Sequence, residues 1–306
     1  MFLSMFNWMR KEPIDVTIRR LAKCGYQSIE ILVDEPSKYN TREMRAILKE
    51  HNLFCVGAGS NMSEGRDLTH ADEAVRASTV QYLKDCITLV EELDGHQMII
   101  VPSQFGKMVP MASEEEEWAW CVEGLKEVYD HSQKAGVVIA LEPLNRFESY
   151  FLNRHDQAIL LAGEVGPNCG VCLDAFHINI EEVDRYQAIL NTGDKLVAFH
   201  VAGNNRMACG QGDYDWVRLV TTLATAGYDG ALTVEFIPPR DRTPANPYLN
   251  ATSAIDLTQE ELKLIQENAS GVLSEEMYTW LVQLSADTLL NAIEKLGVPL
   301  SYNKKK

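Results

Sequence analysis

The stretch VVIALEPLNRFE (residues 137–148) places five apolar residues directly before a carboxylate, Glu142, and two further charges follow at Arg146 and Glu148. A short run without polar alternation is typical of a strand buried on both faces, and such strands form parallel sheets covered by helices. The charge at the end of this strand has two explanations. It is either the first residue of a surface loop or part of a site to which the strand leads.

Seven further short runs rich in apolar residues recur along the chain, at residues 2–6, 28–32, 54–58, 97–101, 170–174, 196–200 and 231–235. Amphipathic stretches with helical period lie between them. Gly25, Gly136 and Gly227 stand where three of these helices should end, each just before the next strand. A last helix is expected at residues 274–297, with Ser274 as its N-cap.

Eight alternating strand and helix units in 306 residues predict an α/β protein, a single-domain (β/α)8 TIM barrel that spans residues 1–306. An open doubly wound sheet is the alternative, but no glycine-rich phosphate-binding motif follows the first strand. Residues 237–273 do not fit the alternation, because they are polar and begin with a proline-rich segment. We interpret them as an elaborated loop after the eighth strand, on the C-terminal face, with one short helix at 258–267.

The overall charge narrows the classes of partner. A net charge of −16 and a pI near 4.9 disfavour nucleic acid, whose phosphates the protein would repel. No apolar run approaches the roughly 18 residues that cross a membrane, and the N-terminus lacks a signal-peptide pattern. Seven scattered cysteines, an odd number, fit a reducing compartment. We therefore expect a cytoplasmic protein. Cys169 and Cys172 form a lone CxxC, the spacing of a redox pair or half a zinc site, but Cys172 lies in a predicted strand, and we interpret it as a buried residue.

Four consecutive predicted strands end in side chains that can bind a metal ion: Glu142, Asp174, His200 and Glu235. Singly, such a residue is usually the first solvated residue of a loop, but in a closed barrel adjacent strand ends converge on one mouth. Three crowded carboxylates would repel one another without a cation. Oxygen ligands with one imidazole suit Mn²⁺, Co²⁺ or Mg²⁺. An octahedral ion would keep two positions open for adjacent hydroxyl and carbonyl oxygens of a sugar.

Four segments resemble the signature segments of ketose 3-epimerases, the tagatose and allulose 3-epimerases of the xylose-isomerase-like TIM-barrel superfamily: LEPLNRFE (141–148), LDAFHINIEE (173–182), FHVAGNNR (199–206) and GYDGALTVEF (227–236). The resemblance is strongest over residues 137–236. It implies four ligands for a divalent metal, with Mn²⁺ favoured and Co²⁺ or Mg²⁺ as alternatives: Glu142, Asp174, His200 and Glu235.

The same resemblance implies the roles of the residues around the metal. Glu142 and Glu235 would be catalytic and stand on opposite faces of the substrate carbon. One would remove the proton beside the carbonyl to give an enediolate, and the other would return a proton from the far side. Glu148, His177 and Arg206 match the substrate-binding positions of the family. The implied reaction is the epimerisation of a ketose at carbon 3.

Two residues depart from the pattern of the family. Gly203 stands where these epimerases usually carry a glutamate, and Cys209 stands where proline is common. A related activity therefore stays open, since the chain also resembles the catalytic subunit of bacterial C-glycoside deglycosidases. These lyases cleave the carbon–carbon bond of 3-oxo-C-glycosides. The epimerase would act on a small keto-sugar as a homo-oligomer, whereas the lyase would act on a 3-oxo-glycoside together with a small second subunit.

Other functions rank lower. Aldose–ketose isomerisation stays open because a metal site alone does not fix which carbon loses its proton. A zinc-dependent endonuclease would need a basic groove, which the acidic composition disfavours. A non-catalytic binding protein would bind no metal.

Overall fold

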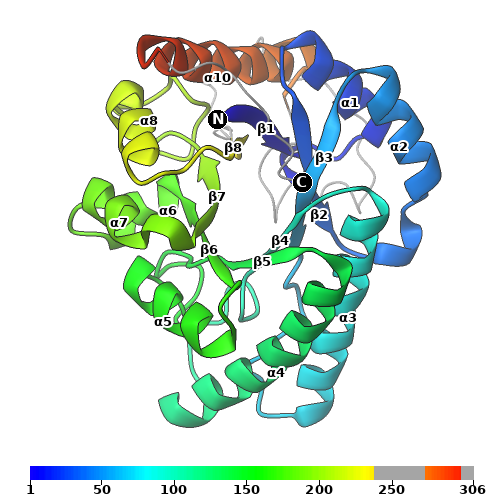
Figure 1. Ribbon diagram of the computed structural model, residues 1–306, viewed down its shortest axis with the longest axis vertical. Coiled ribbons are helices and arrows are strands. Elements are labelled where there is room, and N and C mark those ends of the chain that lie inside the picture. Colours follow the sequence, from blue (N-terminus) through cyan, green and yellow to red (C-terminus); the bar gives the residue numbers. More distant parts are fainter. Residues whose placement is uncertain (238–272, 298–306) are drawn as a thin grey trace, which may run out of the picture.

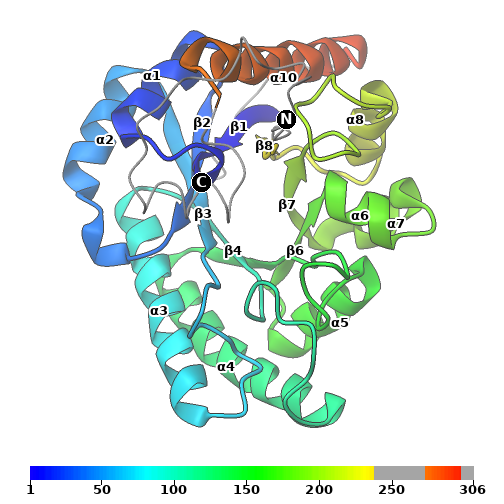
Figure 2. The same cartoon turned by 180° about the vertical axis from the view of Figure 1, so that it is seen from behind.

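The structure of the protein, a computed structural model, describes residues 1–237 and 273–297. Eight parallel strands close into a barrel in chain order, because the last strand pairs back with the first. Helices surround the barrel on its outside (Figure 1), as the view from behind also shows (Figure 2). The strands are β1 (Phe2–Phe6), β2 (Ser28–Val33), β3 (Phe54–Ser60), β4 (Gln97–Ile100), β5 (Val138–Leu141), β6 (Gly170–Asp174), β7 (Leu196–Val201) and β8 (Ala231–Val234). The predicted (β/α)8 barrel is confirmed, and the open sheet is wrong.

The helices that cover the barrel mostly follow the predicted alternation. They are α1 (Ile14–Lys23), α2 (Thr41–Glu50), α3 (Glu73–Glu92), α4 (Glu114–Ala135), α5 (His155–Val165), α6 (Ala175–Glu181), α7 (Arg185–Thr192), α8 (Trp216–Thr225) and α10 (Glu275–Lys295). The connection between β6 and β7 holds two helices where the sequence predicted one. Gly136 ends α4 with φ at 68°, in the left-handed region that glycine adopts without steric cost.

Helix α10 begins where the sequence predicted. The Ser274 hydroxyl accepts a hydrogen bond from the backbone N–H of Met277 at 3.2 Å, which makes Ser274 the N-cap. The Tyr278 ring packs against that of Phe236, with ring centroids 5.8 Å apart. These contacts hold α10 against the residues that follow β8, and Figure 1 shows it lying between α8 and α1.

The predicted loop at 237–273, with its short helix at 258–267, lies outside the described residues except for its two end positions, so it stays a prediction. In the part of the chain that the structure describes, no helix is both long enough and apolar enough to cross a membrane.

All seven cysteines are buried and free. Cys169 and Cys172 are 1% and 0% exposed, which agrees with the interpretation of Cys172 as a buried residue. Cys172 lies in an apolar cluster with Ile99, Ala140 and Ala198, contributed by β4, β5 and β7. Burial raises the pKa of the Cys169 thiol to about 12, so it stays protonated at neutral pH.

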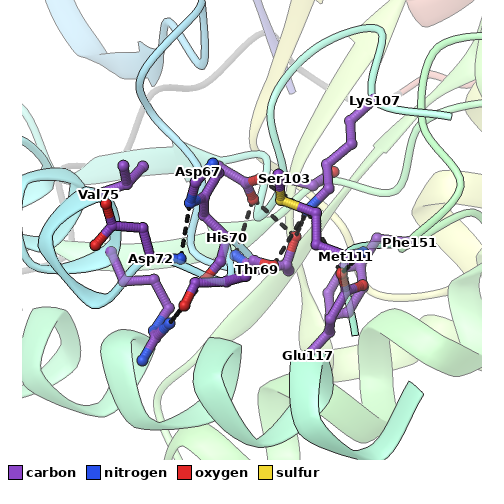
Figure 3. A network of polar contacts seen from close by, with 12 residues as sticks. Asp67, Thr69, His70, Asp72, Val75, Ser103, Lys107, Met111, Glu117 and Phe151 are labelled. Carbon is purple, nitrogen blue, oxygen red and sulfur yellow. Dashed lines mark hydrogen bonds and ion pairs between the residues drawn. The ribbon is translucent and has the colours of Figure 1, made fainter. Parts of the chain in front are cut away.

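A buried ionic network ties together the loops at the C-terminal ends of β3, β4 and β5 (Figure 3). Lys107, in the loop after β4, places its Nζ 2.8 Å from the Asp67 carboxylate and donates to the Thr69 hydroxyl at 2.8 Å. Nζ also lies 3.6 Å from Glu117 of α4, which accepts a hydrogen bond from the Tyr150 hydroxyl. One ammonium thus serves two carboxylates and fixes three loops at the barrel rim.

We expect Lys107→Met to lower the free energy of unfolding by about 3–5 kcal/mol, because it leaves two buried carboxylates without a cation. Urea denaturation followed by circular dichroism measures this. The matched control is Lys84→Met, which breaks an ion pair with Glu127, whose side chain is 59% exposed, and should change stability by less than about 1 kcal/mol. Equal losses in the two variants would show that Lys107 does not hold the rim.

Candidate metal centre and active site

The four predicted metal ligands stand at adjacent strand ends. Asp174 is the last residue of β6 and pairs in register with His200 of β7. Glu142 and Glu235 follow β5 and β8 directly, and their backbone N–H groups donate to Ile100 and Val201 of the neighbouring strands. The sheet pattern therefore runs on through both glutamates. All four residues are at most 6% exposed, so they are not the first solvated residues of loops.

The structure brings these four side chains together. One ligand atom from each lies within 4.8 Å of every other. The Nδ1 atom of His200 is 3.3 Å from a Glu142 oxygen and 3.0 Å from a Glu235 oxygen, yet it is buried and has no hydrogen-bond partner among the described residues. An orphaned imidazole nitrogen among three carboxylates is the donor set that a divalent cation needs. The residues present therefore fit a metal ion of the predicted kind.

The two glutamates differ in their affinity for a proton. Burial raises the pKa of Glu142, and the nearby Glu235 charge adds to this, although His200 opposes it. Burial also acts to raise the pKa of Glu235, but the Arg206 guanidinium and His200 outweigh it and lower that pKa to about 2. Two neighbouring carboxylates whose surroundings shift their pKa values in opposite directions are common in sites that move protons.

Arg206 reaches into this cluster from the loop after β7. Its guanidinium contacts the Asp174 carboxylate, forms an ion pair with Glu235 at 2.9 Å and lies 4.9 Å from the centre of the Phe176 ring. Its backbone adopts φ of 62°, which is uncommon for a residue other than glycine. The Ile237 N–H donates to the Arg206 carbonyl at 2.6 Å. Arg206, with its side chain 11% exposed, is thus part of the site rather than a solvated loop residue.

The departure at Gly203 has a local structural reason. A Cβ atom there would lie 2.6 Å from the Gln211 carbonyl oxygen and 2.6 Å from the Asn205 side-chain oxygen. Gly203 also accepts a hydrogen bond from the Arg206 N–H at 2.9 Å, in the tight turn that sets the arginine backbone. This turn leaves no room for a side chain at position 203, and it orients Arg206.

His177, Asn145 and Glu148 form a chain of hydrogen bonds beside the cluster. His177 is buried, and its Nε2 lies 3.6 Å from Asp174. Its Nδ1 accepts from the backbone N–H of Asn145 at 3.2 Å, so in the neutral ring Nε2 carries the hydrogen. The Asn145 amide donates to Glu148 at 2.7 Å. The structure therefore brings His177 to the metal ligands. Glu148 is exposed and lies on the other side of Asn145 from His177.

Sequence reasoning missed three residues of this site. Trp8, in the 3-10 turn Asn7–Met9 after β1, donates its indole N–H to Glu235 at 2.7 Å. Glu30 of β2 lies 3.3 Å from Nε2 of His200, and Asn145 bonds His177 as described. A carboxylate inside the apolar run SIEIL (28–32) was a visible signal for Glu30. Trp8 carried no such signal.

A closed (β/α)8 barrel with an imidazole and carboxylates gathered at the C-terminal ends of its strands has the architecture of a barrel enzyme. The chain belongs to the xylose isomerase-like TIM barrel family, whose sequence model matches residues 18–267.

Sequence similarity to curated relatives narrows the class of enzyme within this family. The chain is 30% identical to a D-psicose 3-epimerase from Agrobacterium fabrum, over 71% of this chain and 77% of the relative. It is 27% identical to a ketose 3-epimerase from Arthrobacter globiformis, over 73% and 78% of the two chains. These relatives identify an enzyme of the sugar epimerase and isomerase type. A solved D-psicose 3-epimerase from Clostridium cellulolyticum shares the fold, with a TM-score of 0.80, 23% identity and coverage of 96% of this chain and 99% of that one.

Proposed function

We propose that the protein is a divalent-metal-dependent ketose 3-epimerase. The observation that carries this proposal is the cluster of three carboxylates around the orphaned Nδ1 of His200. The names of its relatives, psicose, ketose and ribulose 3-epimerases, support the reaction. The substrate class is accordingly a free keto-sugar.

Four residues would hold the cation in this proposal: Glu142, Asp174, His200 and Glu235. A bound divalent cation supplies positive charge beside the substrate oxygens on which negative charge develops. Mn²⁺ is favoured, with Co²⁺ or Mg²⁺ as alternatives, because the donors are mostly oxygen. Arg206 contacts two of the same carboxylates, so it partly neutralises them before any cation arrives.

The proton chemistry belongs to Glu142 and Glu235 in this proposal. One carboxylate removes the proton from carbon 3, and the other delivers a proton to the opposite face, which inverts the centre. The Nε2–H of His177 and the guanidinium of Arg206 donate hydrogen bonds to the carbonyl and hydroxyl oxygens of the sugar. Glu148, linked to His177 through Asn145, holds that donor in place and binds the substrate at the rim.

The alternative lyase gains nothing from these observations, since the relatives reported above are epimerases. A homo-oligomer stays a prediction for the epimerase. We also infer a cytoplasmic location, because seven free, buried cysteines suit a reducing compartment.

Hydrogen exchange in heavy water tests the proposed reaction. The Mn²⁺-loaded protein is incubated in D2O with fructose, tagatose or allulose, and carbon 3 is followed by NMR. We expect deuterium at carbon 3 of at least one ketose together with its 3-epimer. A chelator-treated sample is the control and should show neither. No exchange with any of the three sugars would contradict the proposal, and a 3-oxo-C-glycoside would be tested next.

A further inference from the structure

Glu30 is a fully buried carboxylate in the middle of β2. It accepts a hydrogen bond from the Thr233 hydroxyl at 3.0 Å and one from the Gln97 amide at 3.3 Å. Its other oxygen lies 3.3 Å from Nε2 of His200. The carboxylate therefore joins β2 to β4, β7 and β8 inside the barrel. Among the described residues, no lysine or arginine forms an ion pair with Glu30. Burying such a carboxylate costs several kcal/mol, whereas an apolar residue would fill the same space without that penalty.

The contact with Glu30 determines which nitrogen of the His200 ring carries the hydrogen. A carboxylate only accepts hydrogen bonds, so the Nε2 atom that faces it must carry the hydrogen. In the neutral ring the lone pair then belongs to Nδ1, and Nδ1 is the atom that points at Glu142 and Glu235 and lacks a partner among the described residues. The bonds from Thr233 and Gln97 hold the Glu30 carboxylate in this orientation.

We propose that Glu30 is the positioning residue of the metal centre: it fixes the His200 tautomer and ring orientation so that Nδ1 binds the cation. This inference rests on the proposed function, because it presumes that a metal binds at His200. Partners of this kind typically change metal affinity by 10–100-fold, because they orient the ligand and strengthen its donor atom. Glu30 itself touches neither the cation nor the substrate in this proposal.

The test measures Mn²⁺ affinity by titration calorimetry in the full-length protein and three variants. Glu30→Gln should raise the Mn²⁺ dissociation constant by about 10–100-fold. Thr233→Val keeps the carboxylate but removes one of its hydrogen bonds, so we expect a smaller increase of about 2–10-fold. Ser4→Ala is the matched control and should bind as the wild type does, since Ser4 is buried beside Thr233 in the barrel register and its hydroxyl has no partner in the described part of the chain.

A second readout separates positioning from general support of the fold. In the Mg²⁺-loaded, ¹⁵N-histidine-labelled protein, NMR should show the hydrogen of His200 on Nε2 in the wild type. Glu30→Gln should bind less metal at the same Mg²⁺ concentration, and its metal-free fraction should show the other tautomer or a mixture, while the Ser4→Ala spectrum stays unchanged.

The possible outcomes are distinct. A wild type that binds no divalent metal would refute the proposed function itself. A wild type that binds Mn²⁺, with Glu30→Gln equal to it in affinity and tautomer, would overturn only the role of Glu30. If Glu30→Gln does not fold, the Mn²⁺ dissociation constant of Thr233→Val is the test. A value equal to that of the wild type overturns the inference.

Discussion

Glu142→Gln and Glu235→Gln should each lower kcat by at least about 100-fold at saturating Mn²⁺, because a general acid or base contributes about 10²–10⁴-fold. Glutamine keeps the shape of the side chain, and its carbonyl oxygen can still accept the hydrogen bond that Trp8 donates to residue 235. It cannot take up or release a proton. Inversion needs one proton-transferring group on each face of the carbon, so the loss of either glutamate stops turnover.

The initial rate of appearance of the 3-epimer measures this effect, with metal content checked by elemental analysis in the same samples. Glu127→Gln is the matched control, because Glu127 lies on the outer helix α4 with its side chain 59% exposed. That variant should keep the wild-type rate. If Glu142→Gln or Glu235→Gln keeps more than about a tenth of the wild-type rate with metal bound, the glutamate replaced in that variant has no catalytic role.

The positions of the four candidate ligands could be predicted because a barrel turns chain order into spatial convergence. Each apolar run fixes a strand, and the residue at its end comes to the shared mouth whatever conformation the following loop adopts. Asp174 and His200 lie opposite each other for this reason, since β6 and β7 are neighbours in register. Their proximity follows from topology alone, without knowledge of any loop.

The contacts that support the ligands could not be predicted in the same way. The indole of Trp8 meets Glu235 across 227 positions of the chain, and Glu30 meets His200 across 170. A hydrophobic pattern shows that a residue is buried, but it does not show which side chain faces it across the barrel. The left-handed backbone of Arg206 was equally hidden, because it depends on the tight turn at Gly203.

His200→Ala should leave the protein without bound Mn²⁺ after dialysis, and this is the second large effect that we expect. The variant removes the imidazole from the cluster and also leaves the Glu30 carboxylate buried beside an empty space. Both changes weaken Mn²⁺ binding. The loss of Mn²⁺ affinity should therefore exceed the 10–100-fold expected for Glu30→Gln, which keeps the imidazole.

Elemental analysis of the dialysed protein measures the metal bound to His200→Ala. His131→Ala serves as the control, because His131 lies on α4 next to Thr88 and away from the cluster, and it should retain the metal. One equivalent of Mn²⁺ retained by His200→Ala would show that the carboxylates suffice, and Glu30 would then have no ligand to position. If the Mn²⁺ content falls from wild type to Glu30→Gln and again to His200→Ala, the imidazole is in direct contact with the metal and Glu30 acts through it.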